Sequence, residues 1–262
     1  MGPNPPGAAY LSPRWSGLLR ESGLSSIHVP RGFRGRFVGA GWMTLGLSQG
    51  IWRKAAPWFH PQVRALLRQR CSLWIFPAQD SLSFQVPVPA LVSIADLMHR
   101  YERRFPEVGN RLEYHLREAN FRNICRWSSG IIVDSRTGRE QVAESYRVPT
   151  DRIFVLPYVP PGTLNRGETG EADFDARYSL PSRFLFYPAQ FWFHKNHANL
   201  LRAVALARKE APDEIAACIL RLWRDDNLCD SLKKRGSERA AMWGQREFNS
   251  RLLEIIEQVV SR

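Results

Sequence analysis

The chain has 262 residues, of which 44% are hydrophobic and 24% charged, so it can bury a large core and has the composition of a globular protein. No run of about 18 apolar residues is present, which argues against a membrane-spanning helix. The four cysteines have no CxxC spacing, which argues against a zinc site and a disulfide framework. Because the first residues, MGPNPPGAAYL, also lack the layout of a secretion signal, we expect a cytoplasmic protein.

The formal net charge of +12 is concentrated in the amino-terminal part of the chain. Ten Lys or Arg residues precede Cys71, against one acidic residue, Glu21, so this part carries nine of the net charges. Such a surface suits an anionic membrane, a phosphorylated acceptor or nucleic acid, and a solubilising surface without a dedicated partner is the alternative. Since no nucleic-acid-binding motif is recognisable, we expect peripheral contact with an anionic membrane and no nucleic-acid partner.

The first seventy residues give weak signals for regular structure. Residues 1–40 are rich in Pro, Gly and Arg without a clear period, which predicts loop or poorly ordered structure and no convincing first strand. Residues 42–58 mix aromatic and small residues, and residues 61–70 are typical of a short helix with a basic end.

From residue 72 the pattern sharpens into alternating strands and helices. Strands are predicted in SLWIFPA, PALVSIADL, SGIIVDS and DRIFVLPYV, and helices at residues 111–127 and 137–148. This alternation predicts an α/β fold with a parallel, doubly wound sheet. Asp96 and His99 follow the second of these strands, where an open α/β sheet presents its carboxyl ends to a ligand. A strand-end turn for Asp96 and a structural hydrogen bond for His99 are the alternatives.

A polar, Gly-bearing stretch at residues 163–177 predicts a linker between two domains. Beyond it, residues 184–187 predict a buried strand, residues 194–197 a polar turn, and the following residues a helix. Three further helices are predicted at residues 213–224, with Asp213 as N-cap, 226–242 and 246–260, with Gly236 or Gly244 as a break.

The turn before the first of these helices carries a cation. The free backbone N–H groups at a helix start attract anions, and Lys195 adds a full charge there, so the sequence predicts a phosphate or diphosphate site. A solvated loop residue beside an ordinary helix is the alternative.

Two stretches resemble family-4-type glycosyltransferases, whose fold is the two-domain GT-B arrangement. YPAQFWFHKNHANLLRAVALA is similar to the start of the family's donor-binding domain. DLMHRYERRFPEV and the residues from REANFRNICRW to LPYVPPG resemble the back half of its acceptor-side domain. The resemblance implies an acceptor-side domain at residues 1–162 and an incomplete donor domain at residues 178–262.

The same resemblance implies transfer of a sugar from a nucleotide-sugar to a glycan or lipid-linked acceptor, without a cofactor or an obligatory metal. Lys195, with Gln190 and Asn196, would bind the donor diphosphate, and Asp96 and His99 would serve the catalytic, acceptor side. Many members carry a cation where this chain has Gln190.

Part of the family's donor domain has no counterpart in this chain. The strands that should flank residues 184–187, and the pair of glutamates that holds the donor, are absent from the sequence. A single parallel strand cannot satisfy its own backbone groups, so we expect weak or no catalysis and a marginally stable carboxyl-terminal part. The closing helices carry amphipathic stripes, such as Leu252, Ile255, Ile256 and Val259, and are expected to pack against the acceptor-side domain instead. An inactive relative acting as a binding partner and a basic nucleic-acid-binding protein are the alternative functions.

Overall fold

The computed structural model describes residues 8–10, 25–27, 42, 48–108, 110–159, 178–181, 183–210 and 213–262. The chain forms two compact units, which we describe separately. The first unit comprises Met1–Leu97, Leu116–Val155 and Ile255–Arg262, and the second comprises Met98–His115 and Leu156–Glu254. The predicted linker at residues 163–177 lies outside the described residues, as does most of the segment 1–40.

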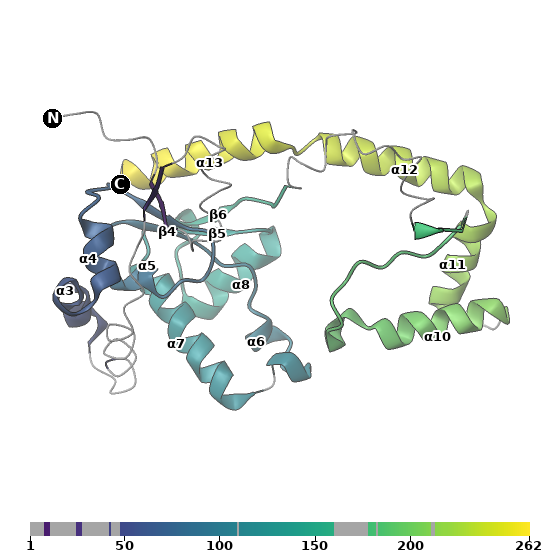
Figure 1. The fold of residues 1–262 in the computed structure, drawn as a ribbon, viewed down its shortest axis with the longest axis horizontal. Helices are drawn as coiled ribbons and strands as arrows, with labels where there is room; N and C mark the ends of the chain where they lie inside the picture. The colour runs from purple at the N-terminus through teal and green to yellow at the C-terminus, as the bar shows by residue number, and fades with distance from the viewer. Residues whose placement is uncertain are drawn as a thin grey trace. The chain divides into compact units, whose positions relative to one another are not determined.

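A four-stranded parallel sheet forms the centre of the first unit (Figure 1). Its strands, in spatial order, are β3 Trp74–Phe76, β4 Ala90–Ser93, β5 Gly130–Val133 and β6 Ile153–Val155. All four predicted strands and their parallel pairing are confirmed. The spatial order follows the chain in one direction, so the described sheet is α/β and parallel but does not contain the strand-order reversal of a doubly wound fold.

Helices connect the strands and precede the sheet. They are α3 Gln49–Phe59, α4 Pro61–Leu67, α5 Leu82–Gln85, α7 Arg111–Trp127, which belongs to this unit from Leu116 onward, and α8 Arg136–Tyr146. The predictions of α4, α7 and α8 are confirmed. Helix α3 was not predicted, because it carries Pro57 within it and apolar residues on both its buried and its exposed sides, which hides the helical period.

The amino-terminal segment also contains two short strands that the sequence analysis did not predict. Strands β1 Ala8–Tyr10 and β2 Ser25–Ile27 pair in parallel. Their sequences, AAY and SSI, are too short and too mixed to show the alternation by which strands are usually recognised.

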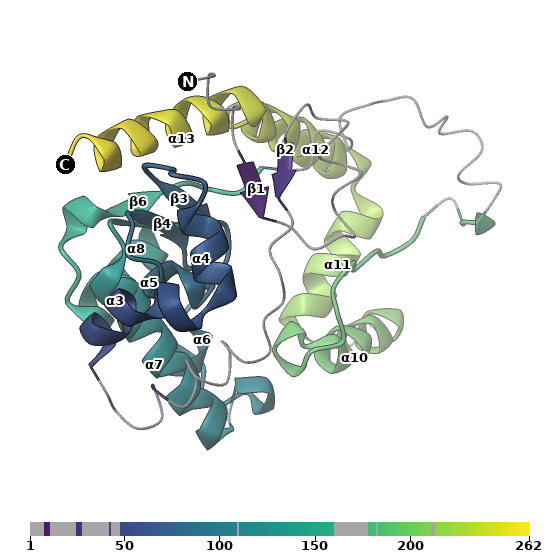
Figure 2. The same ribbon diagram turned by 60° about the vertical axis from the view of Figure 1, so that its left-hand side comes forward.

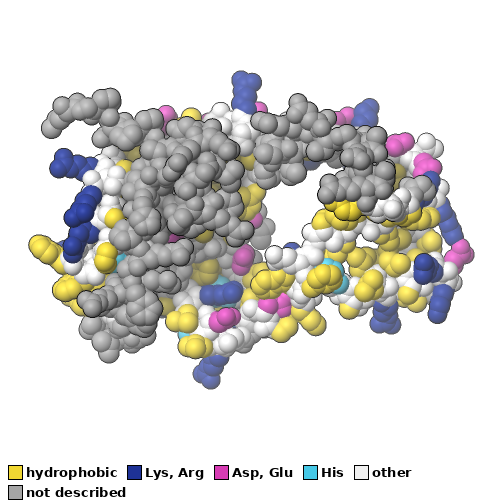
Figure 3. All heavy atoms as spheres, viewed as in Figure 1, with side chains coloured by type: hydrophobic (Ala, Val, Ile, Leu, Met, Phe, Trp, Pro, Cys, Tyr) yellow, Lys and Arg dark blue, Asp and Glu magenta, His cyan; other side chains and the backbone are white. Residues whose placement is uncertain are grey.

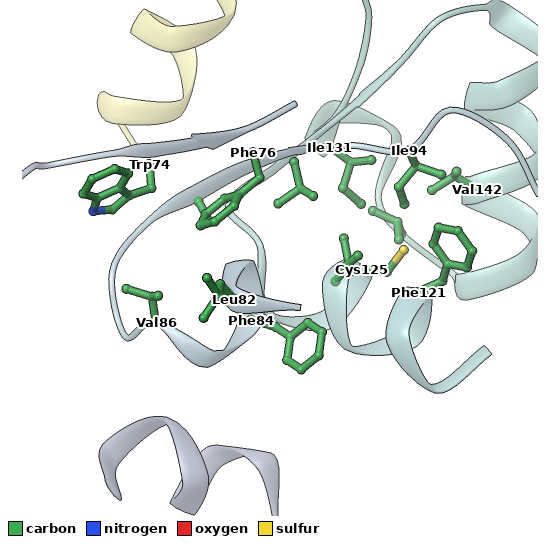
Figure 4. Close-up of a cluster of buried hydrophobic side chains, with 14 of the residues drawn as sticks. Trp74, Phe76, Leu82, Phe84, Val86, Ile94, Phe121, Cys125, Ile131 and Val142 are labelled. Atoms are coloured by element: carbon green, nitrogen blue, oxygen red, sulfur yellow. The ribbon is translucent and has the colours of Figure 1, made fainter. Parts of the chain in front are cut away.

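One face of the sheet packs against helices α5, α7 and α8 (Figure 4). Figure 4 shows Trp74, Phe76 and Ile131 pointing from the strands toward Leu82 and Cys125 on the helices. Side chains at alternate positions of a strand point to the same face, so these residues form one continuous apolar layer. This layer is the main hydrophobic core of the first unit.

The other face of the sheet is covered by the carboxyl-terminal end of α13 (Gln245–Val260), which passes over it in both ribbon views (Figures 1 and 2). Ile255 and Val259, one turn apart on this helix, are 0% and 5% exposed. The helix packs closely on β5 at Gly130, where an added Cβ would lie 3.0 Å from Val259. The prediction that this stripe packs against the first part of the chain is confirmed for Ile255 and Val259.

The second unit consists mainly of helices. They are α6 Met98–Tyr101, α10 His197–Arg208, α11 Glu214–Arg224, α12 Asp226–Ala241 and the first part of α13, with single turns of 3-10 helix at Pro106–Val108 and Phe193–Lys195. Asp213 caps α11 as predicted, because its carboxylate accepts from the N–H of Ala216 at 2.9 Å. The break falls at Gly244, whereas α12 runs through Gly236.

The predicted strand at residues 184–187 is wrong. These residues have no regular secondary structure, and Phe184, Leu185, Phe186 and Tyr187 are 46% to 77% exposed. A strand needs a neighbour to satisfy its backbone N–H and C=O groups, and the described residues of this unit contain no strand that could pair with it. Residues 184–187 therefore stay outside any described sheet, although their sequence is as apolar as that of a buried strand.

Candidate functional site

The first unit has a pocket of about 210 Å³ where strands β4 and β5 end and helix α8 begins. Its polar lining residues are Asp96, Asp134, Ser135, Thr137 and Gln141. Because the two strands are parallel neighbours, the residues that follow them meet at the same edge of the sheet. The pocket therefore lies at the carboxyl ends of the strands, the edge at which open α/β sheets bind ligands, although the described sheet has no strand-order reversal there.

The start of α8 gives the pocket its shape. Ser135 is the N-cap of this helix, and its hydroxyl oxygen accepts a hydrogen bond from the N–H of Gly138 at 3.1 Å. A Cβ added at Gly138 would lie 3.3 Å from that oxygen and 3.4 Å from Val133. The glycine thus allows the first turn of the helix to approach the end of β5 closely.

The chemistry of the lining favours a ligand that carries hydroxyl groups. Two carboxylates, two hydroxyls and one amide line the pocket, and its described lining residues include no Lys, Arg or His. Carboxylates accept hydrogen bonds strongly, whereas they repel a phosphate or another anion. A neutral polyol such as a sugar satisfies these groups better than an anionic ligand does.

Asp96 and His99, which the sequence analysis paired, have different surroundings. Asp96 is exposed and lines the pocket, whereas His99 is not among the lining residues. His99 is 1% exposed in α6, and its ring centroid lies 5.7 Å from that of Tyr114. The guanidinium of Arg103 lies 4.7 Å from the centroid of the same Tyr114 ring. This buried aromatic environment agrees with the structural alternative for His99.

The predicted diphosphate site lies in the second unit, at the start of α10. Lys195 and Asn196 are both exposed there, directly before the helix. Asn196 has a φ of 59°, in the left-handed region, and its side chain makes no capping hydrogen bond. The hydroxyl of Tyr187 donates to the backbone carbonyl of Lys195 at 2.9 Å. This bond holds the backbone of the turn at Lys195.

Gln190, the third predicted diphosphate ligand, is exposed, and its side-chain oxygen accepts a hydrogen bond from the indole N–H of Trp192. This bond leaves the amide NH₂ group as the donor for a ligand. Of the three predicted residues, Lys195 ends the single 3-10 turn Phe193–Lys195, Asn196 follows it directly, and Gln190 precedes it.

A contact that the sequence analysis missed holds this turn. The carboxylate of Glu107 lies 2.6 Å from Nδ1 of His194 and accepts from the backbone N–H of His194 at 3.0 Å. The backbone hydrogen bond from His194 is the largest cause that lowers the pKa of Glu107 below its usual value. Because this carboxylate meets the residue directly before Lys195, its negative charge offsets part of the attraction for an anion.

Sequence reasoning also missed Asp134, Thr137 and Gln141 as pocket residues. The signal for Asp134 was present, because it follows a predicted strand in the same way as Asp96 follows the preceding one. The contact between Glu107 and His194 had no such signal, since 87 positions separate the two residues.

A second pocket, of about 490 Å³, lies in the second unit and is apolar. It is lined by Leu185, by Val204, Ala207 and Arg208 of α10, and by Ile219, Leu220 and Trp223 of α11. Leu185 belongs to the segment that has no strand partner, so this pocket is part of the incomplete core of the second unit.

A scan against protein-family models, a search of curated proteins and a search of solved structures each find no match. Among the described residues, no group of three or more His, Cys, Asp or Glu side chains could hold a metal ion. All four cysteines are free thiols. No helix in the described part of the chain is long and apolar enough to cross a membrane.

Proposed function

We propose that this protein is a relative of the nucleotide-sugar-dependent glycosyltransferases of the GT-B type and that its first unit binds the acceptor. The observation that carries the proposal is the pocket at the ends of β4 and β5, where Asp96 and Asp134 stand among hydroxyl and amide groups without a cation in the described lining. A sugar of a glycan or lipid-linked acceptor fits this lining, because its hydroxyls donate to carboxylates and accept from hydroxyl and amide groups.

In the proposed reaction an acceptor hydroxyl oxygen bonds to the anomeric carbon of the donor sugar. The bond from that carbon to the diphosphate breaks, and the diphosphate leaves with the electron pair. Asp96 orients the acceptor hydroxyl and takes up its proton, as a general base does. Lys195, with Gln190 and Asn196, holds the departing diphosphate, whose charge needs a cation and hydrogen-bond donors. His99, which is buried beside Tyr114 and does not line the pocket, has a structural role in this scheme.

A second candidate function is sugar binding without turnover. It is favoured by the donor side, where residues 184–187 form no strand and Glu107 offsets the charge next to Lys195. Positioning of the donor supplies much of the rate of such a transfer, and an open, unpaired segment positions little.

The two candidates are separated by measuring transfer and binding on the full chain. Incubation with a panel of nucleotide-sugars, with and without glycan acceptors, detects transfer as release of nucleoside diphosphate. Calorimetry with glycans then tests the pocket. Asp96→Asn should weaken glycan binding roughly fivefold, because a neutral amide oxygen, which still accepts, replaces a charged acceptor whose hydrogen bond is worth about 1 kcal/mol more.

The control for the pocket is Asp230→Asn on the exposed surface of α12, which should leave glycan binding unchanged. Lys195→Ala removes the charged donor altogether and should weaken nucleoside diphosphate binding roughly tenfold to a hundredfold, whereas the exposed Lys209→Ala should not weaken it. Binding without release of diphosphate supports the second candidate. Glycan affinity that is the same in wild type and Asp96→Asn refutes the acceptor pocket.

A further inference from the structure

Helix α3 has apolar side chains on two opposite sides. Trp52 and Ala56 are 1% and 0% exposed and belong to the core of the first unit. On the outer side, Ile51, Trp58 and Phe59 are 59%, 77% and 60% exposed. A surface helix normally turns polar residues toward water, so a second apolar side indicates a second surface that covers it.

Exposed cations lie on helices α3 and α4 and directly after them. Lys54 lies on α3, Arg64 on α4, and Arg68 directly after α4. No Asp or Glu occurs between Glu21 and Asp80, so nothing within this stretch of sequence neutralises them. Figure 3 shows Lys and Arg side chains next to hydrophobic ones on the side of the molecule where Figure 1 places α3 and α4.

Hydrogen bonds from Arg64 hold the backbone at the end of α3, which carries the exposed aromatic side chains. Arg64 donates through Nε to the carbonyl of Pro57 at 3.0 Å and through its terminal nitrogen to the carbonyl of Trp58 at 2.6 Å. These bonds satisfy carbonyls at the end of α3, which have no partner within the helix. They also hold a guanidinium beside the backbone of the most exposed tryptophan of this surface.

We propose that this surface binds the headgroup region of an anionic lipid bilayer. We call it the α3–α4 face, and it comprises Ile51, Lys54, Trp58, Phe59, Arg64 and Arg68. Tryptophan prefers the boundary between headgroups and hydrocarbon, and lysine and arginine are attracted to anionic lipids at the same depth. The α3–α4 face carries both groups on two adjacent helices, so it complements such a surface in charge and in polarity.

Two other partners fit the α3–α4 face less well. A second copy of the chain would bring Lys54 and Arg68 against like charges, which disfavours a symmetric pair. A nucleic acid would use the cations and could stack on Trp58, but it gives Ile51 no apolar surface to bury. Only a bilayer accommodates the aliphatic, aromatic and cationic side chains together.

The proposal is tested by sedimentation of the full chain with vesicles of phosphatidylcholine and with vesicles in which part of the lipid is phosphatidylglycerol. We expect binding to the anionic vesicles that weakens at high salt. Each of Lys54→Gln and Arg68→Gln should weaken it about fivefold, because each cation near such a surface contributes about 1 kcal/mol. Replacing Trp58 and Phe59 together by Ala should weaken it by at least as much as one of these charge changes.

Matched changes elsewhere serve as controls. Lys233→Gln removes an exposed charge on α12, and Leu112→Ala removes an exposed apolar side chain on α7 that is 68% exposed. Neither should change vesicle binding. Circular dichroism of the Trp58 and Phe59 double variant distinguishes a lost contact from a lost fold.

Several outcomes would overturn the proposal. They are equal binding to neutral and anionic vesicles, and anionic binding that survives both the charge and the aromatic variants. Salt-sensitive binding to DNA or RNA that exceeds vesicle binding would assign the α3–α4 face to nucleic acid. Self-association that the aromatic double variant abolishes would assign it to a second copy. None of these outcomes bears on the acceptor pocket, so the two proposals fail independently.

Discussion

At Gly130, the first residue of β5, the sheet and the carboxyl-terminal helix pack closely together. A Cβ added there would lie 2.9 Å from Leu91, 2.9 Å from Phe154 and 3.0 Å from Val259. All three side chains are buried, so they cannot move into solvent to make room. Gly130→Ala should therefore destabilise the first unit by roughly 1–3 kcal/mol, the usual cost of overpacking, as measured by urea denaturation.

Gly236 provides the matched control. It lies within α12, and a Cβ there would meet no atom within 4 Å. Alanine is favoured over glycine inside a helix, so Gly236→Ala should stabilise α12 by about 0.5–1 kcal/mol. If Gly130→Ala leaves the stability of the first unit unchanged, the close packing described for β5 is contradicted.

Glu107 makes the turn before α10 sensitive to acid. The hydrogen bonds from His194 lower the pKa of this carboxyl in the folded chain. A carboxyl with a depressed folded pKa stabilises the fold above its unfolded pKa, which is about 4.3 for Glu. That stabilisation is lost as the pH falls from there through the folded pKa.

Glu107→Gln should accordingly remove this part of the pH dependence. Glutamine still accepts from the N–H of His194 but does not titrate, so its stability should fall less than that of the wild type between about pH 5 and pH 3. Tryptophan fluorescence during urea denaturation at a series of pH values measures the difference. Parallel stability curves for the two proteins would mean that the contact with His194 does not shift the titration of Glu107.

At the candidate site, sequence reasoning predicted one pocket residue correctly, overlooked another, and grouped a buried residue with the first. Asp96 was found because it follows a strand, and the structure places it in the pocket. Asp134 follows the next strand in the same way and was overlooked. His99 was grouped with Asp96 by its nearness in sequence, but its side chain is buried beside Tyr114. Nearness along the chain did not place the two side chains together, because Asp96 lies in the loop after β4 whereas His99 lies within α6.

At the scale of elements, the sequence predicted β3 to β6 and helices α7, α8, α11, α12 and α13 to within a few residues. Those elements are marked by short apolar runs between prolines, or by long helical stripes with caps such as Asp213. Residues 184–187 have an equally apolar sequence, yet they form no strand. A helix satisfies its own hydrogen bonds, whereas a strand exists only together with its neighbours.

Hydrogen exchange distinguishes these two kinds of apolar segment. Amides of β5 are buried between β4 and β6 and should exchange slowly, near the rate set by global unfolding. Amides of residues 184–187 should exchange rapidly, because they lack partners among the described residues and their side chains are exposed. Mass spectrometry of the exchanged peptides measures both. Strong protection of residues 184–187 in the monomer would show that the segment has a strand partner after all.

At the scale of the whole molecule, the first unit is not one continuous part of the chain. It takes its last segment, Ile255–Arg262, from the carboxyl-terminal end, far beyond β6 in sequence. The apolar stripe of α13 indicated that this helix needs a surface to cover, but periodicity alone could not show which surface. The side chains around Gly130 identify it as the face of the sheet opposite α7.

If α13 stabilises the first unit, truncating its buried side chains should destabilise that unit and truncating its exposed ones should not. Ile255 belongs to the first unit and is 0% exposed, whereas Leu253, two positions earlier, is 59% exposed. Ile255→Ala leaves a cavity under the helix and should destabilise the first unit by about 2–5 kcal/mol, as truncation of a buried isoleucine usually does. Leu253→Ala should cost less than about 0.5 kcal/mol, because an exposed side chain loses few contacts.

The measurement must report on the stability of the sheet and not only on that of α13. Hydrogen exchange of the β5 amides is therefore followed alongside urea denaturation. If α13 stabilises the sheet, Ile255→Ala should accelerate exchange in β5, which is far from residue 255 in sequence, and Leu253→Ala should not. If Ile255→Ala speeds exchange only within α13, the helix rests on the sheet without stabilising it. The first unit would then be complete without the end of the chain, and the sheet face around Gly130 would need another cover.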